Sequence, residues 1–311
     1  MATASFGHQG RSFKLERRKF LGASTFVATG LLAYPYVSNG STAMAGEAKG
    51  AAEKLGWKLA CQLYTFRRFP FYEAIERIAR LGIKRLEPAF FLRLAADRPG
   101  LTTSEALSAE LRAEMKQRLQ ALGLTMPNYY ADLTTDRKQA QRVFQFAREM
   151  GVETIVSEPP PEAFPMLDEL CQEFGINLAV HNHPQSPTSR YWHPEKVLAV
   201  CEGRSQRIGA CCDTGHWVRS GLRPVECLRM MKGRIITMHL KDVAEFGKPE
   251  ARDVILGTGV AGYEAVLKEL HGQGFKGVLT IEYEHDSPEL ENDVAACVSF
   301  VEKVAAKLLE G

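Results

Sequence analysis

The sequence lacks several features that would assign it to a common class at once. Its 311 residues contain no uninterrupted apolar run of about 18 residues, which argues against a membrane-spanning helix or other stable membrane anchor. No GxGxxG motif follows the first predicted strand (58–66), which disfavours a dinucleotide-binding sheet. The seven cysteines show no CxxC or zinc-knuckle spacing. We therefore expect the cysteines to be buried, reduced and hydrophobic in character.

The sequence also lacks an excess of basic charge over most of its length. The formal net charge is +2, but residues 1–45 carry five basic side chains against Glu16, a net of +4. The remainder of the chain is therefore close to −2. Binding to nucleic acid needs a basic surface, so we expect no nucleic-acid partner.

The N-terminal segment has the order of an export signal. The adjacent Arg17 and Arg18 precede an apolar run at 25–37, and Ala43-Met44-Ala45 offers a small-residue cleavage site. The arginine pair resembles the twin-arginine pattern. We expect residues 1–45 to be a cleaved twin-arginine signal peptide and linker, the export machinery to be a partner, and the location to be periplasmic or otherwise exported. A disordered basic tail or a cytoplasmic N-terminal helix is the alternative.

From residue 58 onward, short β-branched apolar runs alternate with longer amphipathic segments. The predicted strands span 58–66, 83–90, 124–130, 153–159, 176–184, 207–213, 234–242 and 277–284. The predicted helices span 71–81, 104–122, 136–150, 161–174, 194–202, 224–232, 261–273 and 288–309. Five helices are followed by a glycine suited to a left-handed residue: Gly82, Gly123, Gly151, Gly175 and Gly274. This alternation predicts an α/β fold, a single (β/α)8 TIM barrel over residues 46–311, in preference to an open doubly wound sheet.

Polar side chains gather at the C-terminal ends of the predicted strands, where the active site of such a barrel lies. His181, Asp213, His239 and Glu282 end four consecutive strands, and period-two alternation places them inside the barrel. Two imidazoles and two carboxylates suit a divalent metal such as Mn²⁺, Co²⁺, Zn²⁺ or Mg²⁺. Each residue alone could equally be a capping group or a hydrogen-bonded histidine. The tripeptide Asp213-Thr214-Gly215 also occurs in aspartic proteases, but it occurs once here, which disfavours a protease dyad.

Five short motifs carry a family resemblance. CQLYTFR, HNHP, CDTGHW, MHLKD and IEYE together resemble the xylose isomerase-like TIM-barrel superfamily over nearly all of residues 57–311. That superfamily includes sugar-phosphate isomerases and epimerases, tagatose and psicose 3-epimerases, inosose dehydratases, dehydroshikimate dehydratases and endonuclease IV. The resemblance implies a divalent metal, often Mn²⁺ or Co²⁺, with Asp213, His239 and Glu282 as ligands and His216 as a substrate contact.

One motif departs from the epimerase branch. Where that branch has its first metal-binding glutamate, this sequence has His181, and Glu158 on the preceding strand could provide the missing carboxylate. This departure puts a two-glutamate epimerase mechanism in doubt. Some members with HNH motifs resemble lyases that act on 3-keto-glycosides.

The resemblance implies a metal-dependent sugar isomerase or epimerase that abstracts a proton next to a carbonyl and forms a metal-stabilised enediolate. Glu282 or Glu158 would remove the proton, and His183, His216 or Lys241 would return it. Expulsion of a β-oxygen instead would make the enzyme a lyase or dehydratase. A non-catalytic sugar-binding barrel and a metal nuclease are further alternatives.

Several further residues are expected to contact a sugar or polyol substrate. Tyr64, Trp217, Tyr129 and Trp192 could stack on sugar rings, although ordinary packing explains such aromatics equally well. Glu87 stands at the end of the second predicted strand and is expected to bind substrate. An oligomer is compatible with the sequence.

Overall fold

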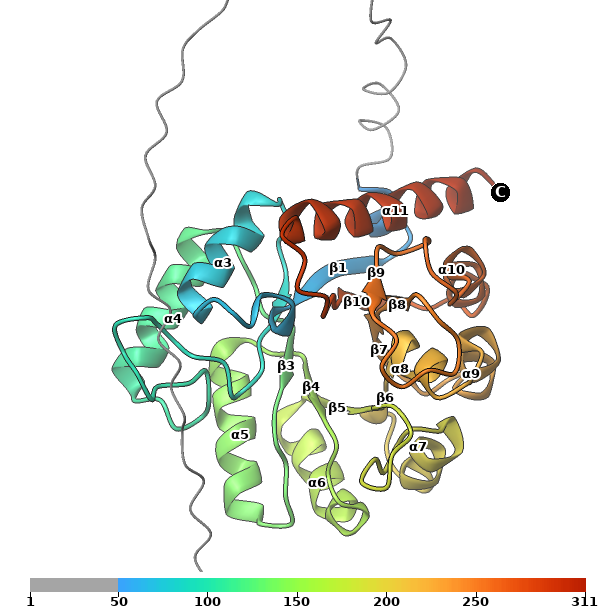
Figure 1. Cartoon of the computed structure of the whole chain (residues 1–311). Coiled ribbons are helices and arrows are strands. Elements are labelled where there is room, and N and C mark those ends of the chain that lie inside the picture. Colours follow the sequence, from blue (N-terminus) through green and yellow to red (C-terminus); the bar gives the residue numbers. More distant parts are fainter. Residues whose placement is uncertain (1–49) are drawn as a thin grey trace, which may run out of the picture. The chain divides into compact units, whose positions relative to one another are not determined.

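Eight parallel strands form a nearly closed barrel in the computed structural model, which describes residues 50–311 (Figure 1). The predicted signal peptide lies outside the described residues. The sheet order is β2-β1-β10-β7-β6-β5-β4-β3. Isolated bridges between Arg85 and Thr125 and between Ala89 and Tyr130 join the segments of β2 and β3.

The barrel strands are β1 (Trp57–Gln62), β2 (Leu86–Glu87), β3 (Asn128–Tyr130), β4 (Thr154–Ser157), β5 (Asn177–His181), β6 (Ile208–Asp213), β7 (Ile235–Leu240) and β10 (Gly277–Ile281). The predicted (β/α)8 fold is confirmed.

Helices surround the barrel and follow the predicted segments closely (Figure 1). Each of the five predicted helix-ending glycines has a positive φ, between 65° and 78°, where residues with a β-carbon are strained. The outer helices are α3 (Phe71–Arg80), α4 (Ala109–Ala121), α5 (Arg137–Met150), α6 (Phe164–Phe174), α7 (Pro194–Cys201), α9 (Pro224–Met230), α10 (Tyr263–Gly272) and α11 (Leu290–Glu310). A short helix, α2 (Ala51–Lys54), packs beside α11 before the first strand.

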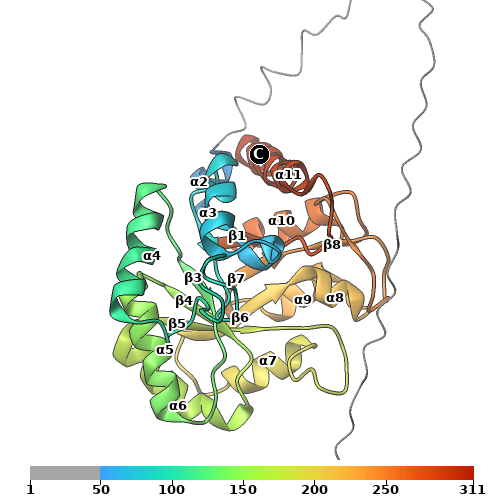
Figure 2. The same ribbon diagram turned by 60° about the vertical axis from the view of Figure 1, so that its left-hand side comes forward.

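Three local elements were not predicted. The first strand stops at Gln62, whose side-chain oxygen accepts a hydrogen bond from the Tyr64 amide and begins the 3₁₀ helix η1 (Leu63–Phe66); a second such turn, η2 (Pro161–Ala163), leads into α6. A six-residue helix, α8 (Thr214–Arg219), follows β6 where the sequence predicts a loop. After β7, the strands β8 (Asp242–Val243) and β9 (Asp253–Val254) pair antiparallel, with β8 beside α8 (Figure 2).

The barrel interior is built in layers along the strands. Val156, Ala179 and Cys211 form a small apolar cluster inside the barrel. His181 and Asp213 lie two residues further along the same strand faces, so the candidate ligands stand directly above this cluster. The main hydrophobic core fills the space between strands and helices.

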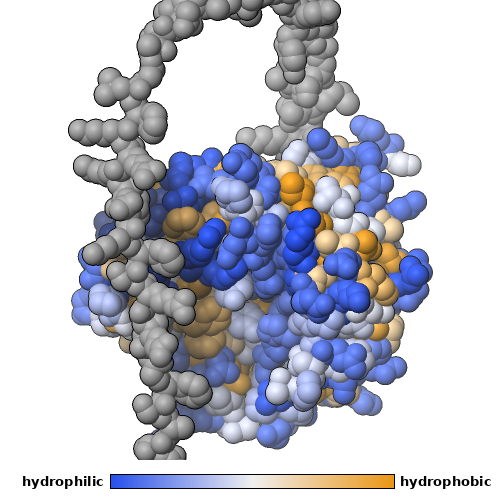
Figure 3. All heavy atoms as spheres, viewed as in Figure 1, coloured by the Kyte–Doolittle hydropathy of each residue, from blue (hydrophilic) through white to orange (hydrophobic). Residues whose placement is uncertain are grey.

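All seven cysteines are buried and form no disulfide, as predicted. Burial raises the pKa of the Cys211 thiol to about 12, which keeps it protonated. In the described part of the chain no helix is long and apolar enough to cross a membrane. The face of the molecule seen in Figure 3 is mainly hydrophilic, with apolar residues in separate patches.

Candidate metal centre and active site

Four consecutive strands bring the predicted metal ligands together. His181 ends β5, Asp213 ends β6, His239 is the penultimate residue of β7, and Glu282 directly follows β10. Each of the four side chains is buried and offers one ligand atom within 4.8 Å of the others. His239 Nδ1 lies 3.0 Å from Glu282 Oε2, and His181 Nε2 lies 3.5 Å from Asp213 Oδ2. Strand register alone therefore assembles a four-residue donor set.

The hydrogen bonding of these four residues fits a bound cation. Four atoms are buried and have no hydrogen-bond partner, one from each residue: His181 Nε2, Asp213 Oδ2, His239 Nδ1 and Glu282 Oε2. These atoms contact one another and Lys241 as ion pairs, in place of the hydrogen bonds that buried polar atoms normally make. A divalent metal would satisfy all four atoms at once. The residues present therefore fit the metal that the sequence predicts.

The two carboxylate oxygens of Asp213 face different partners. Oδ1 accepts a hydrogen bond from the His216 amide at 2.8 Å and caps α8, while Oδ2 faces the donor set. The capping and metal-binding interpretations of this residue are therefore compatible. Because the cap starts α8, it also fixes where His216 emerges over the barrel mouth.

Each imidazole of the candidate metal centre contacts a carboxylate through its other ring nitrogen. His239 Nε2 lies 2.7 Å from Glu87 Oε1, and His181 Nδ1 lies 3.2 Å from Glu158 Oε1. A carboxylate that accepts the N–H of one ring nitrogen leaves the other nitrogen free to bind metal. Glu87 itself is fully buried and accepts a further hydrogen bond from Asn128 Nδ2 at 3.0 Å. This placement beneath His239 does not support the predicted substrate contact for Glu87.

Glu158 joins His181 to a second histidine at the cavity wall. Its Oε1 also accepts hydrogen bonds from His183 Nδ1 at 2.5 Å and from the Tyr130 hydroxyl at 2.9 Å. Burial opposes ionisation of Glu158, but the hydrogen bonds from the two histidines outweigh it and hold its pKa well below the usual range. A carboxylate this close favours the tautomer of neutral His183 that carries its proton on Nδ1, which leaves Nε2 as the acceptor.

Lys241 is a buried cation that contacts three carboxylates of the site. Its Nζ lies 3.2 Å from Asp213 Oδ2, 3.1 Å from Glu282 Oε2 and 2.9 Å from Glu284 Oε1. Burial disfavours the charge, but these carboxylates outweigh it and raise the pKa of Lys241 well above its usual value. The side chain is fully buried and does not line the cavity, so Lys241 is a charged group held against the carboxylates.

His216 lies between two cationic side chains. Arg219 Nη1 is 3.1 Å from its Nδ1, and Lys241 Nζ is 3.3 Å from its Nε2. Burial, together with Lys241, lowers the pKa of His216 well below its usual value despite the nearby Asp213 carboxylate, so the ring is neutral. Both flanking side chains are hydrogen-bond donors, and a neutral imidazole has one acceptor nitrogen, so His216 accepts from one of them at a time.

A cavity of about 260 Å³ opens above the donor set. Among the predicted contacts, Tyr64, His183 and His216 line it, together with His181, His239 and Glu282. Four other lining residues were not assigned a role from the sequence: Gln62, Phe91, Tyr130 and Glu284. Gln62 and Tyr130 end barrel strands, Glu284 ends the last predicted strand and Phe91 follows the second, and this position at strand ends is the signal that could have identified them.

Two of the predicted stacking aromatics lie elsewhere. Trp217 is 2% exposed and packs in the main core, because α8 turns this side chain away from the mouth. Tyr129 is fully buried and donates its hydroxyl to the Thr103 carbonyl. This burial does not support a stacking role for either residue. Tyr64 does line the cavity, and its ring packs edge-on against Phe91 with centroids 6.0 Å apart.

Curated relatives match part of the chain. The chain is 31% identical over 135 residues to the rhizopine catabolism protein MocC of Rhizobium meliloti, which covers 39% of this chain and 40% of that protein. It is 28% identical over 144 residues to the inosose dehydratase of Bacillus cereus (strain AH820), which covers 40% of this chain and 46% of that enzyme. The chain thus spans less than half the length of the curated relatives it matches.

Solved structures and a family profile match more of the chain. An uncharacterized protein from Parabacteroides distasonis ATCC 8503 superposes with a TM-score of 0.63 at 27% identity, covering 80% of this chain and 99% of that one. The IOLI protein, solved with a bound zinc atom, superposes with a TM-score of 0.60 at 18% identity, covering 80% and 98%. The profile named Xylose isomerase-like TIM barrel matches residues 75–303. The chain belongs to the xylose isomerase-like TIM barrel family.

Proposed function

We propose that the protein is a divalent-metal-dependent enzyme that isomerises or epimerises a sugar or polyol by moving a proton next to a carbonyl. The observation that carries this proposal is the cluster of four buried donor atoms without hydrogen bonds on His181, Asp213, His239 and Glu282, beside a cavity that three of these residues line. The zinc atom bound by the IOLI protein supports metal dependence, whereas the named inosose dehydratase relative bears on the second candidate below.

The residues around the site have distinct tasks in this proposal. A metal bound by the four donors would supply a Lewis acid that polarises the substrate carbonyl and a neighbouring hydroxyl. His183 is placed to accept the proton, because it lines the cavity and Glu158 fixes Nε2 as its free acceptor. Glu282 and Glu158 are less suited as bases than the sequence suggests, since surrounding cations and histidines hold their pKa values well below the usual range.

His216 lines the cavity beside His183, and their ring centroids are 5.1 Å apart. Behind His216, the buried Lys241 retains its charge. This charge would stabilise the oxygen on which negative charge develops as the proton leaves carbon. Tyr64 and Phe91 provide an aromatic wall for the apolar face of a sugar ring.

A lyase or dehydratase acting on a keto-sugar or 3-keto-glycoside is the second candidate. The inosose dehydratase relative favours it, and so does a buried ammonium positioned behind the cavity wall. Proton abstraction is common to both reactions. They differ in whether the proton returns to carbon or a β-oxygen is expelled.

Two measurements test the proposal. The metal content of the purified protein is expected to be one divalent ion per chain, and His239→Ala is expected to lose it; an unchanged content in the variant would contradict the site. Metal-loaded protein incubated in D₂O with ketoses, aldoses and 3-keto-glycosides is then followed by NMR. Deuterium on an α-carbon without fragmentation supports an isomerase or epimerase, whereas release of an aglycone or water supports a lyase.

Export by the twin-arginine pathway remains part of the proposal, on the strength of Arg17, Arg18 and the small residues at 43–45. N-terminal sequencing of the protein recovered from the producing cell tests it. A mature chain beginning at Gly46 is expected, and an intact N-terminus on active protein would contradict export by cleavage.

A further inference from the structure

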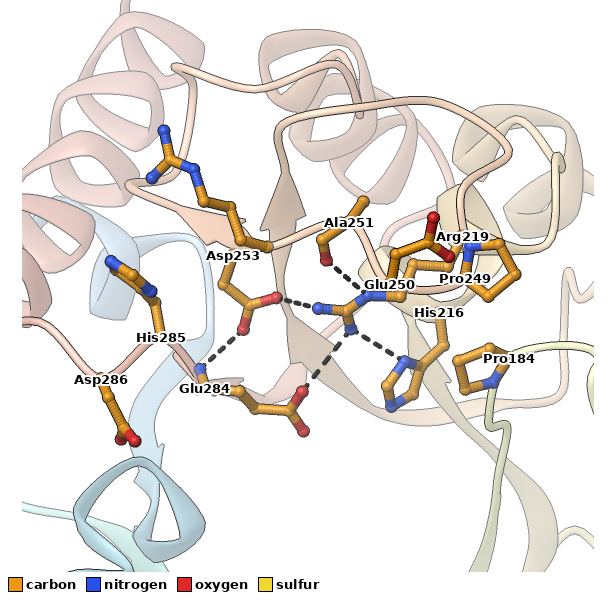
Figure 4. A pocket seen from close by; sticks show the side chains of 11 residues that line it. Pro184, His216, Arg219, Pro249, Glu250, Ala251, Asp253, Glu284, His285 and Asp286 are labelled. Carbon is orange, nitrogen blue, oxygen red and sulfur yellow. Dashed lines mark hydrogen bonds and ion pairs between the residues drawn. The ribbon is translucent and has the colours of Figure 1, made fainter.

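A second cavity adjoins the proposed catalytic cavity (Figure 4). Its volume is about 460 Å³, and its walls come from the segment after β5, from α8, from residues 249–253 and from residues 284–286 after β10. His216 and Glu284 line both cavities. A ligand that fills both cavities would therefore pass beside these two side chains.

The shared wall is a rigid, hydrogen-bonded structure. Arg219 is 7% exposed, and its guanidinium bonds to His216 Nδ1, to the Ala251 carbonyl at 3.0 Å and to the Asp253 carboxylate. Asp253 also accepts the Glu284 amide at 2.6 Å. Figure 4 shows the guanidinium of Arg219 joined by dashed lines to Ala251, Asp253, Glu284 and His216. The cavity is thus fixed to the same residues that shape the catalytic site.

Glu284 is held between two cations at this wall. Its Oε1 lies 2.9 Å from Lys241 Nζ, and its Oε2 lies 3.6 Å from Arg219 Nη1. The side chain is 27% exposed, which is enough to contact a ligand. Since both oxygens are already oriented, Glu284 can accept hydroxyl hydrogen bonds at the junction of the two cavities without reorganising.

The lining of the second cavity suits a neutral, hydroxyl-rich group. Glu250, Arg252 and His285 line it, and no ion pair or side-chain hydrogen bond within residues 50–311 engages their side chains. Two arginines face four carboxylates around the cavity, so the balance of charge disfavours a phosphate group. The lining contains no phenylalanine, tyrosine or tryptophan, which disfavours a flat apolar group. The hydrogen-bond donors of Arg252 and His285 and the acceptor oxygens of Glu250 match the hydroxyl groups of a second sugar ring.

We infer that the substrate is a glycoside of two linked rings, with the reacting ring above the metal ligands and the second hydroxylated ring in the cavity beyond His216 and Glu284. This inference rests on the proposed function. The catalytic cavity of about 260 Å³ is at the small end for a ligand site and suits one ring. The adjoining volume provides a separate subsite, and Glu250, Arg252 and His285 determine preference for the second ring.

Calorimetric titration of the metal-loaded full-length protein tests the subsite with matched pairs of probes: fructose with lactulose, and glucose with cellobiose. Each disaccharide is expected to bind at least tenfold more tightly than its monosaccharide. Glu250→Trp, which fills the second cavity, should abolish that advantage and leave monosaccharide binding unchanged. Glu245→Trp, on the same exposed segment but outside the cavity lining, is the control and should retain the advantage.

A second variant tests the subsite independently, in case Glu250→Trp does not fold. Arg252→Ala combined with His285→Ala removes two contacts without adding bulk, and should weaken disaccharide binding at least tenfold. Glucose 6-phosphate should gain nothing over glucose. The subsite is overturned if a sugar exchanges deuterium in D₂O yet no disaccharide gains affinity, or if the gain survives in both cavity variants. If no sugar of either size exchanges, the proposed function fails and this inference fails with it.

Discussion

His239 Nε2 lies 2.7 Å from Glu87 Oε1, although 152 residues separate the two in the chain. Their strands, β7 and β2, are not neighbours in the sheet, so the contact crosses the interior of the barrel. Glu87 Oε2 in turn contacts Asn128 and Thr280, which places the carboxylate in a buried polar layer below the metal ligands. This contact fixes which nitrogen of His239 faces the metal.

Replacing Glu87 with glutamine should weaken metal binding by about 10- to 100-fold, because a neutral amide orients the imidazole less strongly and lowers its basicity. Competition with a chelator measures the metal affinity. Glu153→Gln is a matched control, since Glu153 forms an exposed ion pair with Lys58. Equal affinities in the two variants would show that Glu87 does not position the ligand.

His181 and His183 should separate metal binding from turnover. His181→Ala removes an unpartnered donor and should abolish stoichiometric metal, whereas His183→Ala should keep the metal and slow deuterium exchange by about 10²- to 10⁴-fold. Metal analysis and NMR exchange rates on the same preparations report the two effects. Loss of metal from His183→Ala, or normal exchange by it, would contradict the proposed base.

Lys241→Met should destabilise the metal-free protein by about 3–5 kcal/mol, because it leaves the buried carboxylates of Asp213 and Glu282 without their cation. Saturating Mn²⁺ should restore part of this loss, since the metal also compensates those charges. Urea unfolding with chelator and with metal measures both values. Lys307→Met, which breaks an exposed ion pair with Glu264, should change neither. The same loss with and without metal would refute the shared role.

Asp253 should make stability fall as the pH rises from about 4 to 6. Burial raises the pKa of Asp253 to about 6, more than the nearby Lys241 and Arg219 lower it. Because the folded pKa lies above the ordinary aspartate value of 3.8, the folded state binds the extra proton. The stabilisation is therefore fully present below pH 3.8 and is lost as the pH passes 6, by up to about 3 kcal/mol.

The difference in unfolding free energy between wild type and Asp253→Asn isolates this contribution across pH 4 to 7. It should decline with rising pH and level off above pH 6. Asp286→Asn, which alters an exposed pair with Arg67, should give a difference that is flat with pH. A flat profile for Asp253→Asn would mean that its ion pair with Arg219 fully offsets its burial.

Much of the barrel could be predicted because it depends on local patterns. Alternating strand faces and glycines with positive φ recur with each strand–helix unit, so eight repeats indicate the fold even where individual boundaries are inexact. That the four candidate ligands lie together was predicted for the same reason: parallel strands end at one edge of the barrel, and His181, Asp213, His239 and Glu282 occupy equivalent positions.

The roles of the carboxylates that contact the candidate ligands could not be predicted from the sequence. Glu87 and Glu158 were identified as strand-end carboxylates and expected near the substrate or the reacting proton. Their contacts with His239 and His181 depend on distances across the barrel that no local pattern encodes. Trp217 was expected at the mouth, but the Asp213 cap starts a helix there, and that helix directs the indole into the core.

The sequence by itself determined the repeating strand–helix order, the burial of the cysteines and the identity of the donor set, because each follows from residue type and periodicity. Only the tertiary structure decided which atoms of those donors lack partners, which carboxylates hold the imidazoles, and where His216 and Glu284 divide two cavities. These properties depend on side chains from distant segments meeting at hydrogen-bond distance, and barrel closure alone brings those segments together.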